Sequence, residues 1–175
     1  MMSIVSFFWL CVILFAFVGW MRGWAKELLV SFSAILALAL NYILRRYIPL
    51  VANLDEADVT LFWVRTIILL VLVYFGYQTV SLSRLTAKAA REKVQDALFG
   101  GILGGFNGYL ITGSILYWMN VANYPYPKFI SRPTDPAIVE TVNQMMAYMP
   151  PQLLGEPGIY FAIIIAFIFV LVVYI

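Results

Sequence analysis

The chain has 175 residues, of which 63% are hydrophobic, 17% aromatic and only 11% charged. Globular domains average about 45–50% apolar and about 25% charged residues, so a soluble fold of this length could not hide the excess apolar surface. The composition therefore excludes an ordinary soluble domain and predicts one domain of membrane-embedded helices. The net charge of +2 and the lack of a dense basic stretch argue against a nucleic-acid partner.

The residue types that the chain lacks exclude several classes of enzyme. It has no histidine, the commonest metal ligand and general base, and its one cysteine, Cys11, lies inside an apolar run. Ser/His/Asp and Cys/His catalytic sites and zinc sites are thereby excluded, and Cys11 is interpreted as a small buried hydrophobe. We therefore expect no catalytic residue, no metal and no cofactor, and we predict a non-enzymatic protein.

Five apolar segments are long enough, or nearly so, for the roughly 20 residues that cross a bilayer as a helix. They lie at about 4–20, 28–44, 61–80, 98–121 and 159–175, and none alternates as a barrel strand would. The second is the weakest by length, and we expect its helix to extend past Arg45 and Arg46. The predicted fold is an all-α integral membrane protein with a four-helix core, a fifth C-terminal transmembrane helix and a short interfacial amphipathic helix.

The charges that flank the spans predict their orientation. The first span has no basic residue before it and is followed by Arg22 and Lys26, which predicts an uncleaved anchor. The connections on that side carry six basic residues against five on the other side, and the compact basic cluster within 84–93 decides the assignment. We expect that side to face the cytoplasm and the N-terminus to lie outside. Residues 1–121 then form the four-span core, 122–158 an external Pro-rich loop and 159–175 the fifth span.

Two of the connections are expected to contain helices of their own. Residues 83–97 interleave charged and apolar residues, which predicts either a solvated extension of the neighbouring helices or a membrane-surface helix. The 122–158 loop holds seven of the eight prolines, and Asp135 followed by Pro136 predicts a helix start. The apolar residues that follow at helical spacing are Ile138, Val142, Met145, Met146 and Met149. They predict an amphipathic helix at the outer interface, with a groove for a partner peptide as the alternative.

The fourth span is unusually rich in glycine, with six of the eleven in the chain. Gly100, Gly104 and Gly108 repeat every four residues and share one helix face, which lets another backbone approach closely. This face is predicted to pack against a helix of the same chain; a homodimer contact and a helix that moves during transport are the alternatives. The other glycines of the span are Gly101, Gly105 and Gly113. The first two lie beside the face, and the last is predicted to lie off it.

Few polar side chains fall within the spans. Arg65, about one turn into the third span, is expected to reach outward to the headgroups as an anchor. Gln78 and Asn107 are the main amides at depth and are predicted to join helices, with a substrate contact as the alternative. No acidic residue falls in the middle of a span, which argues against a proton pump of the carboxylate-relay type.

Two short motifs resemble the colicin V production protein (CvpA) family. Residues 22–27, RGWAKE, are similar to the family's Arg-Gly-aromatic-x-basic-Glu turn, and its Asp-x3-Gly-x3-Gly-x3-Gly pattern begins at Asp96. The motif residues outside the glycine repeat are Arg22, Gly23, Lys26, Glu27 and Asp96. Ala97 and Asn107 stand where the family commonly has arginine. The resemblance covers roughly residues 4–149 and implies a CvpA-like four-helix core, with the span at 159–175 outside it.

The resemblance implies a multi-pass protein of the bacterial inner membrane that assists toxin export or envelope homeostasis. The alternative is a small accessory subunit of a respiratory or photosynthetic membrane complex, whose helices pack against other subunits, carotenoid or lipid. A channel or transporter is a third hypothesis, for which the spans offer little polar material. The expected partners are membrane lipid and the helices of other membrane proteins, in a homo-oligomer or a larger complex.

The topology brings the charged motif residues to one membrane depth. Arg22 and Lys26 follow the first span, and Asp96 precedes the fourth on the same side. An unpaired charge near the headgroups is costly, so we predict that Asp96 forms an ion pair with Arg22 or Lys26. The alternative is that each of these charges contacts water or lipid phosphate.

Overall fold

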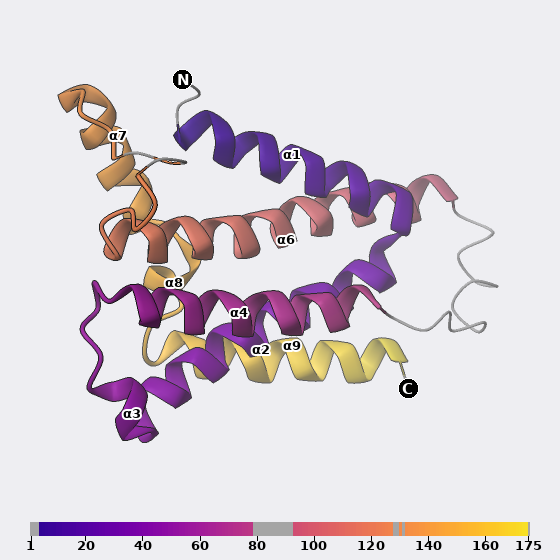
Figure 1. Ribbon diagram of the computed structural model, residues 1–175. Coiled ribbons are helices and arrows are strands. Elements are labelled where there is room, and N and C mark those ends of the chain that lie inside the picture. Colours follow the sequence, from indigo (N-terminus) through magenta and orange to yellow (C-terminus); the bar gives the residue numbers. More distant parts are fainter. Residues whose placement is uncertain (1–3, 79–92, 128–129, 131, 175) are drawn as a thin grey trace.

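The computed structural model describes residues 4–78, 93–127, 130 and 132–174, and every regular element within these residues is a helix (Figure 1). Four helices are long and apolar enough to cross a membrane: α1 (Ile4–Arg22), α2 (Trp24–Tyr47), α4 (Val59–Tyr77) and α6 (Lys93–Val121). The shorter helices are α3 (Pro49–Ala52), α7 (Pro136–Ala147), α8 (Pro150–Leu153) and α9 (Gly158–Tyr174). The all-α membrane fold that the composition predicts is confirmed.

The long helices run back and forth between two ends of the molecule (Figure 1). At one end, here called the Gly23 end, α1 meets α2, α4 finishes and α6 begins. At the other, here called the Pro-rich end, α8 lies against the last turns of α6, and α3 and α7 lie at the same end of the molecule. Because the long helices alternate in direction, the first turns of α2 and α6 meet at the Gly23 end although they are far apart in the sequence.

The observed helices extend beyond the apolar segments. α2 continues through Arg45 and Arg46 to Tyr47, as expected. α6 begins at Lys93, before the apolar segment at 98–121, because the first turn of the helix is polar. Of the helix predicted at 83–97, residues 83–92 lie outside the described part of the chain, and the rest forms the first turn of α6.

The C-terminal helix α9 packs along α2. The Phe32 and Phe167 ring centroids are 6.3 Å apart, and those of Tyr42 and Tyr160 are 6.0 Å apart. α9 runs from the Pro-rich end toward the Gly23 end beside α2 (Figure 1). It has 17 residues, fewer than the four long helices. That it forms a fifth membrane crossing stays a prediction.

The glycine face of α6 lies directly against α1. A Cβ atom added to Gly104 would lie 2.9 Å from Gly19 Cα and would overlap the Phe15 carbonyl oxygen. One added to Gly100 would lie 2.9 Å from the Cα of Gly23, and one added to Gly108 would lie 3.0 Å from the α1 backbone. These separations leave no room for a side chain, so the three glycines set how closely the two backbones approach.

The remaining glycines of α6 differ in their surroundings. Gly105 is in ordinary contact with α1, because an added Cβ would lie 3.5 Å from Ala16 Cβ. Gly113, predicted to lie off the packing face, instead contacts the Pro-rich end: an added Cβ would lie 2.9 Å from both Met149 Sδ and Pro150 Cδ. Gly113 therefore lies off the face that packs against α1, as predicted, and packs against the segment that follows α7.

The Pro-rich segment forms the helix that its start signals predict. The Asp135 carboxylate accepts a hydrogen bond of 2.9 Å from the Ala137 amide, and Pro136 occupies the first turn. Val142 and Met146 are buried on one face of α7, as the helical spacing predicts. The location of α7 at the membrane interface stays a prediction.

Candidate functional site

A single glycine turns the chain from α1 into α2. Gly23 has φ 86°, in the left-handed region that glycine adopts without strain. A Cβ at this position would also lie 2.5 Å from Asp96 Oδ2. The turn therefore needs glycine for two reasons, its backbone conformation and the acidic side chain that lies against it.

That acidic side chain caps the start of α2 from another helix. The Trp24 amide, among the first of α2, donates to Asp96 Oδ1 across 3.1 Å, and Gly23 has no side chain to make this bond. A carboxylate is also favoured at this position because it lies at the positive end of the α2 dipole. Asp96 thereby joins the first turn of α6 to the turn between α1 and α2.

One turn further into α2, Glu27 is fully buried. Its Oε1 accepts from Arg22 Nε at 2.8 Å, and its Oε2 accepts from Asn107 Nδ2 at 2.8 Å. Each carboxylate oxygen thus has a donor, one from α1 and one from α6. A buried carboxylate is tolerated only with such partners, because desolvation otherwise penalises the charge heavily.

The Asn107 amide is held in place by further bonds to α2. Its Nδ2 also donates to the Glu27 carbonyl oxygen at 3.0 Å, and its Oδ1 accepts from Ser31 Oγ at 2.6 Å. Both ends of the amide are therefore bonded, and Asn107 is itself fully buried. These bonds at both ends of the amide fix the position of α6 against α2.

Arg22 connects the same group to α4. Its Nη2 donates to the Tyr77 carbonyl oxygen at 3.3 Å, and its guanidinium carbon lies 4.6 Å from the centroid of the Tyr77 ring. We call Arg22, Glu27, Ser31, Tyr77 and Asn107 the Glu27 cluster. It brings together α1, α2, α4 and α6 at the Gly23 end, beside the turn that Asp96 caps.

The comparisons with known proteins identify the family. The family model described as colicin V production protein matches residues 6–134, which is most of the chain. The chain belongs to the colicin V production protein family. The match includes the Gly23 turn, the Glu27 cluster and the glycine face of α6. Comparison with curated proteins and comparison with solved structures each gave no match.

For this member of the colicin V production family, the predicted pairing of the motif charges was wrong. Arg22 forms its ion pair with Glu27, not with Asp96, and Asp96 instead accepts the Trp24 amide. Lys26, the other predicted partner, is exposed at the start of α2. The motif charges do lie at one end of the molecule, but the Trp24 amide at the start of α2 has no partner within its helix, and Asp96 accepts its hydrogen bond.

The structure also places three further polar residues. Gln78 is the exposed C-cap residue of α4, at the Gly23 end rather than at depth, and is not part of the Glu27 cluster. Glu27, in the first turn of α2, is fully buried and bonds to Asn107 of α6. Arg65 bonds to a residue outside its helix: its Nη1 lies 3.0 Å from Oε2 of Glu56, in the loop before α4, and its side chain is 12% exposed.

Two spacings could have indicated the Glu27 cluster. Glu27 and Ser31 are four residues apart, which places them on one face of α2. Asp96 and Asn107 are eleven residues apart, about three helical turns, so they share a face of α6 with the glycine repeat. The spacing does not predict which helix each face contacts, because that depends on how α2 and α6 cross.

We expect loss of the Asp96 cap to destabilise the protein modestly. Asp96→Ala should lower the free energy of unfolding by about 1 kcal/mol, a typical value for removal of a helix-capping oxygen. Asp96→Asn should retain most of the wild-type stability, because the amide oxygen of asparagine still accepts the hydrogen bond from the Trp24 amide. The measurement is unfolding by denaturant in mixed micelles. Equal losses in both variants would show that charge, not the hydrogen bond, is what α2 requires.

The Glu27 cluster joins four helices through hydrogen bonds. The described residues contain no group of three or more acidic or cysteine side chains that could hold a metal ion. Glu27 and Asn107 are fully buried, and each of their side-chain oxygens accepts a hydrogen bond from a neighbouring helix. These bonds hold α1, α2, α4 and α6 in fixed positions relative to one another at the Gly23 end.

Proposed function

We propose that this protein is a non-enzymatic component of the bacterial inner membrane that assists toxin export or envelope homeostasis. The observation that carries the proposal is the Glu27 cluster, because two of the three charged residues of the first motif, Arg22 and Glu27, bond to each other and to neighbouring helices. Membership of the colicin V production family supports the link to toxin production. In this account the motif residues maintain the architecture of the membrane core and do not act on a substrate.

We propose membrane lipid and the helices of other membrane proteins as its partners. The side of α1 that faces away from α6 exposes Trp9, Ile13 and Phe17, at 57%, 66% and 63% of their surface. These residues are four apart and form a continuous apolar stripe along the helix. Such a stripe is stable in lipid or against another helix, which also supports the second candidate, an accessory subunit of a larger membrane complex.

Genetic complementation tests the proposed role. A strain that lacks the gene should secrete less colicin V and survive detergent challenge less well, and the wild-type gene should restore both. Glu27→Gln is the test variant and Lys26→Gln, at an exposed neighbouring position, is its control. For an architectural residue, loss of function follows loss of protein from the membrane.

Two outcomes would contradict the proposal. One is a Glu27→Gln protein that accumulates to the wild-type level yet fails to complement, because that result indicates a chemical role for the carboxylate. The other is a deletion strain with unchanged secretion and survival. Recovery of the protein in mild detergent with fixed amounts of other subunits would instead favour the accessory-subunit candidate.

We expect the N-terminus and the Pro-rich end to lie outside the cytoplasm. Single cysteines at two exposed positions, Asn143→Cys on α7 and Lys93→Cys at the start of α6, should then differ in intact cells when Cys11 is replaced by alanine. An impermeant thiol reagent should label position 143 and reach position 93 only after the membrane is permeabilised. The reverse order of labelling would invert this topology.

A further inference from the structure

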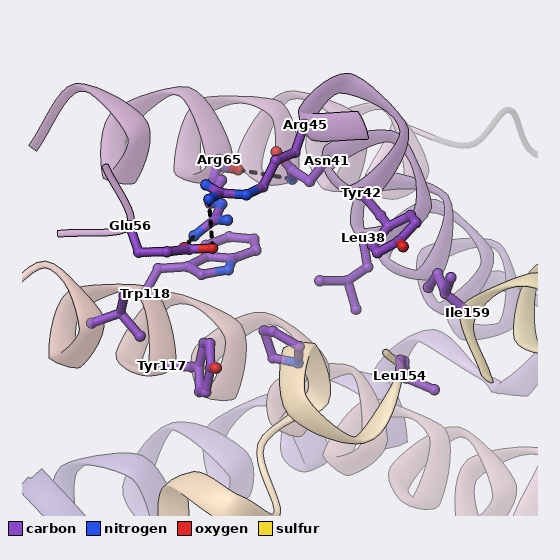
Figure 2. Close-up of a pocket in the computed structure, with 12 residues that line it drawn as sticks. Leu38, Asn41, Tyr42, Arg45, Glu56, Arg65, Tyr117, Trp118, Leu154 and Ile159 are labelled. Atoms are coloured by element: carbon purple, nitrogen blue, oxygen red, sulfur yellow. Dashed lines mark hydrogen bonds and ion pairs between the residues drawn. The ribbon is translucent and has the colours of Figure 1, made fainter. Parts of the chain in front are cut away.

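A second polar feature, unrelated to the Glu27 cluster, lies at the Pro-rich end. A pocket of about 440 Å³ lies between α2, α4, α6 and the α8–α9 segment. Figure 2 shows the residues that line it. Its volume is within the range of about 300–1,000 Å³ that is usual for small-molecule sites. Arg45, Glu56 and Arg65 lie together on one wall, and Leu38, Leu154 and Ile159 lie on the other.

The polar wall carries more positive than negative charge. Glu56 lies between the two arginines: Arg45 Nη2 is 2.9 Å from its Oε1, and Arg65 Nη1 is 3.0 Å from its Oε2. One carboxylate therefore faces two guanidinium groups, which leaves the trio with a charge of +1. Asn41 helps to fix the geometry, because its Nδ2 donates to the Arg65 carbonyl oxygen at 3.3 Å.

One donor of this trio has no partner. Arg45 Nη1 is buried from solvent and has no hydrogen-bond partner in the structure. A buried donor of a charged group that is left unpaired is costly, because it has lost water without gaining a protein acceptor. The surplus charge and the unused donor together indicate a site for an anionic acceptor group.

We propose that this pocket binds the phosphodiester headgroup of an anionic phospholipid of the phosphatidylglycerol class. The phosphodiester carries one negative charge, which matches the charge of the trio, and its oxygens suit guanidinium donors. The apolar wall formed by Leu38, Leu154 and Ile159 suits the first part of the acyl chains. The pocket lies at one end of helices that are long and apolar enough to cross a membrane, where headgroups are expected. This inference does not depend on the proposed role in export.

Binding of a soluble short-chain lipid tests the proposal. The full-length protein in a neutral detergent is titrated with dihexanoyl phosphatidylglycerol, and its dissociation constant and thermal midpoint are measured. Arg45→Gln removes the unpaired donor and should weaken binding at least tenfold. Arg46→Gln is the matched control. Arg46 follows Arg45 in the sequence but is half-exposed, pairs with Glu156 across 3.6 Å and does not line the pocket. Binding by this variant should therefore stay within twofold of wild type.

The choice of ligands distinguishes the source of the anionic group. Dihexanoyl phosphatidylcholine and glycerol phosphate should each bind at least tenfold more weakly than the anionic lipid. Equal binding of phosphatidylcholine, or of glycerol phosphate alone, would overturn the assignment to an anionic phospholipid. Unchanged binding in Arg45→Gln would overturn the assignment to this pocket.

A second measurement keeps the proposal testable if Arg45→Gln does not fold. A phosphatidylglycerol with a photoreactive headgroup is crosslinked to the wild-type protein, and the adducts are mapped by mass spectrometry. Adducts should be enriched on the peptides that contain Glu56 and Arg65, and competition with unlabelled phosphatidylglycerol should remove them. Adducts confined to other helices, or spread evenly along the chain, would overturn the proposal.

Discussion

Replacement of Asn107 by leucine should lower the free energy of unfolding by about 3 kcal/mol. Leucine has the same branched arrangement of heavy atoms but cannot donate to Glu27 Oε2 or to its carbonyl oxygen, and it gives Ser31 no acceptor. Loss of a hydrogen bond to a buried charged group costs about 1.5–3 kcal/mol, and the unpaired groups that stay behind add to the loss. Unfolding of the protein in mixed micelles measures the difference.

Ser114→Ala is the control for this change. Ser114 is also fully buried in α6, but its hydroxyl donates only to the Leu110 carbonyl oxygen of its own helix. Its replacement should therefore lower the free energy of unfolding by less than about 1 kcal/mol. Similar losses of unfolding free energy in the two variants would contradict this prediction. They would show that the contacts of Asn107 with α2 stabilise the protein no more than a hydrogen bond within α6 does.

The second large effect is expected at the contact between α1 and α6. Gly104→Ala places a methyl group against Gly19 Cα and the Phe15 carbonyl oxygen, so the helices must separate; overpacking of this kind costs about 1–3 kcal/mol. Gly105→Ala adds the same atom one residue later, where it makes an ordinary contact with Ala16. It should be neutral or stabilise the helix by up to about 1 kcal/mol.

The difference between these two alanine variants isolates packing from helix propensity. Both changes give the same propensity gain in the same helix, so only the surroundings differ. We expect Gly104→Ala to be about 2 kcal/mol less stable than Gly105→Ala in mixed micelles. Equal stabilities would show that α1 and α6 do not approach as closely at Gly104 as the structure indicates.

The membrane helices could be predicted because their signal is local. Length and apolar composition place each long helix within a few residues of its observed bounds, and the extension of α2 through Arg45 and Arg46 follows from the same reasoning. The glycine repeat likewise indicates a face for close approach. The helix that packs against that face was harder to predict, since the contact depends on another glycine, Gly19, in α1.

The polar contacts were harder to predict because they join residues that are distant in the sequence. Glu27 and Asn107 are 80 residues apart, so no local pattern links them. The prediction that Asp96 pairs with a basic residue placed the charges at the correct end but ignored the unbonded amide of Trp24. Backbone groups at helix ends compete for the same carboxylates as arginine and lysine, and this competition is settled by geometry.

Arg22 and Glu27 form the connection between α1 and α2 within the Glu27 cluster. Double-mutant cycles with alanine at Arg22, Glu27 and Asp96 test it most directly, with unfolding in mixed micelles as the readout. We predict a coupling energy of about 2 kcal/mol between Arg22 and Glu27, and a value at least about 1 kcal/mol smaller between Arg22 and Asp96. Additive losses for Arg22 and Glu27, or stronger coupling of Arg22 to Asp96, would contradict the account.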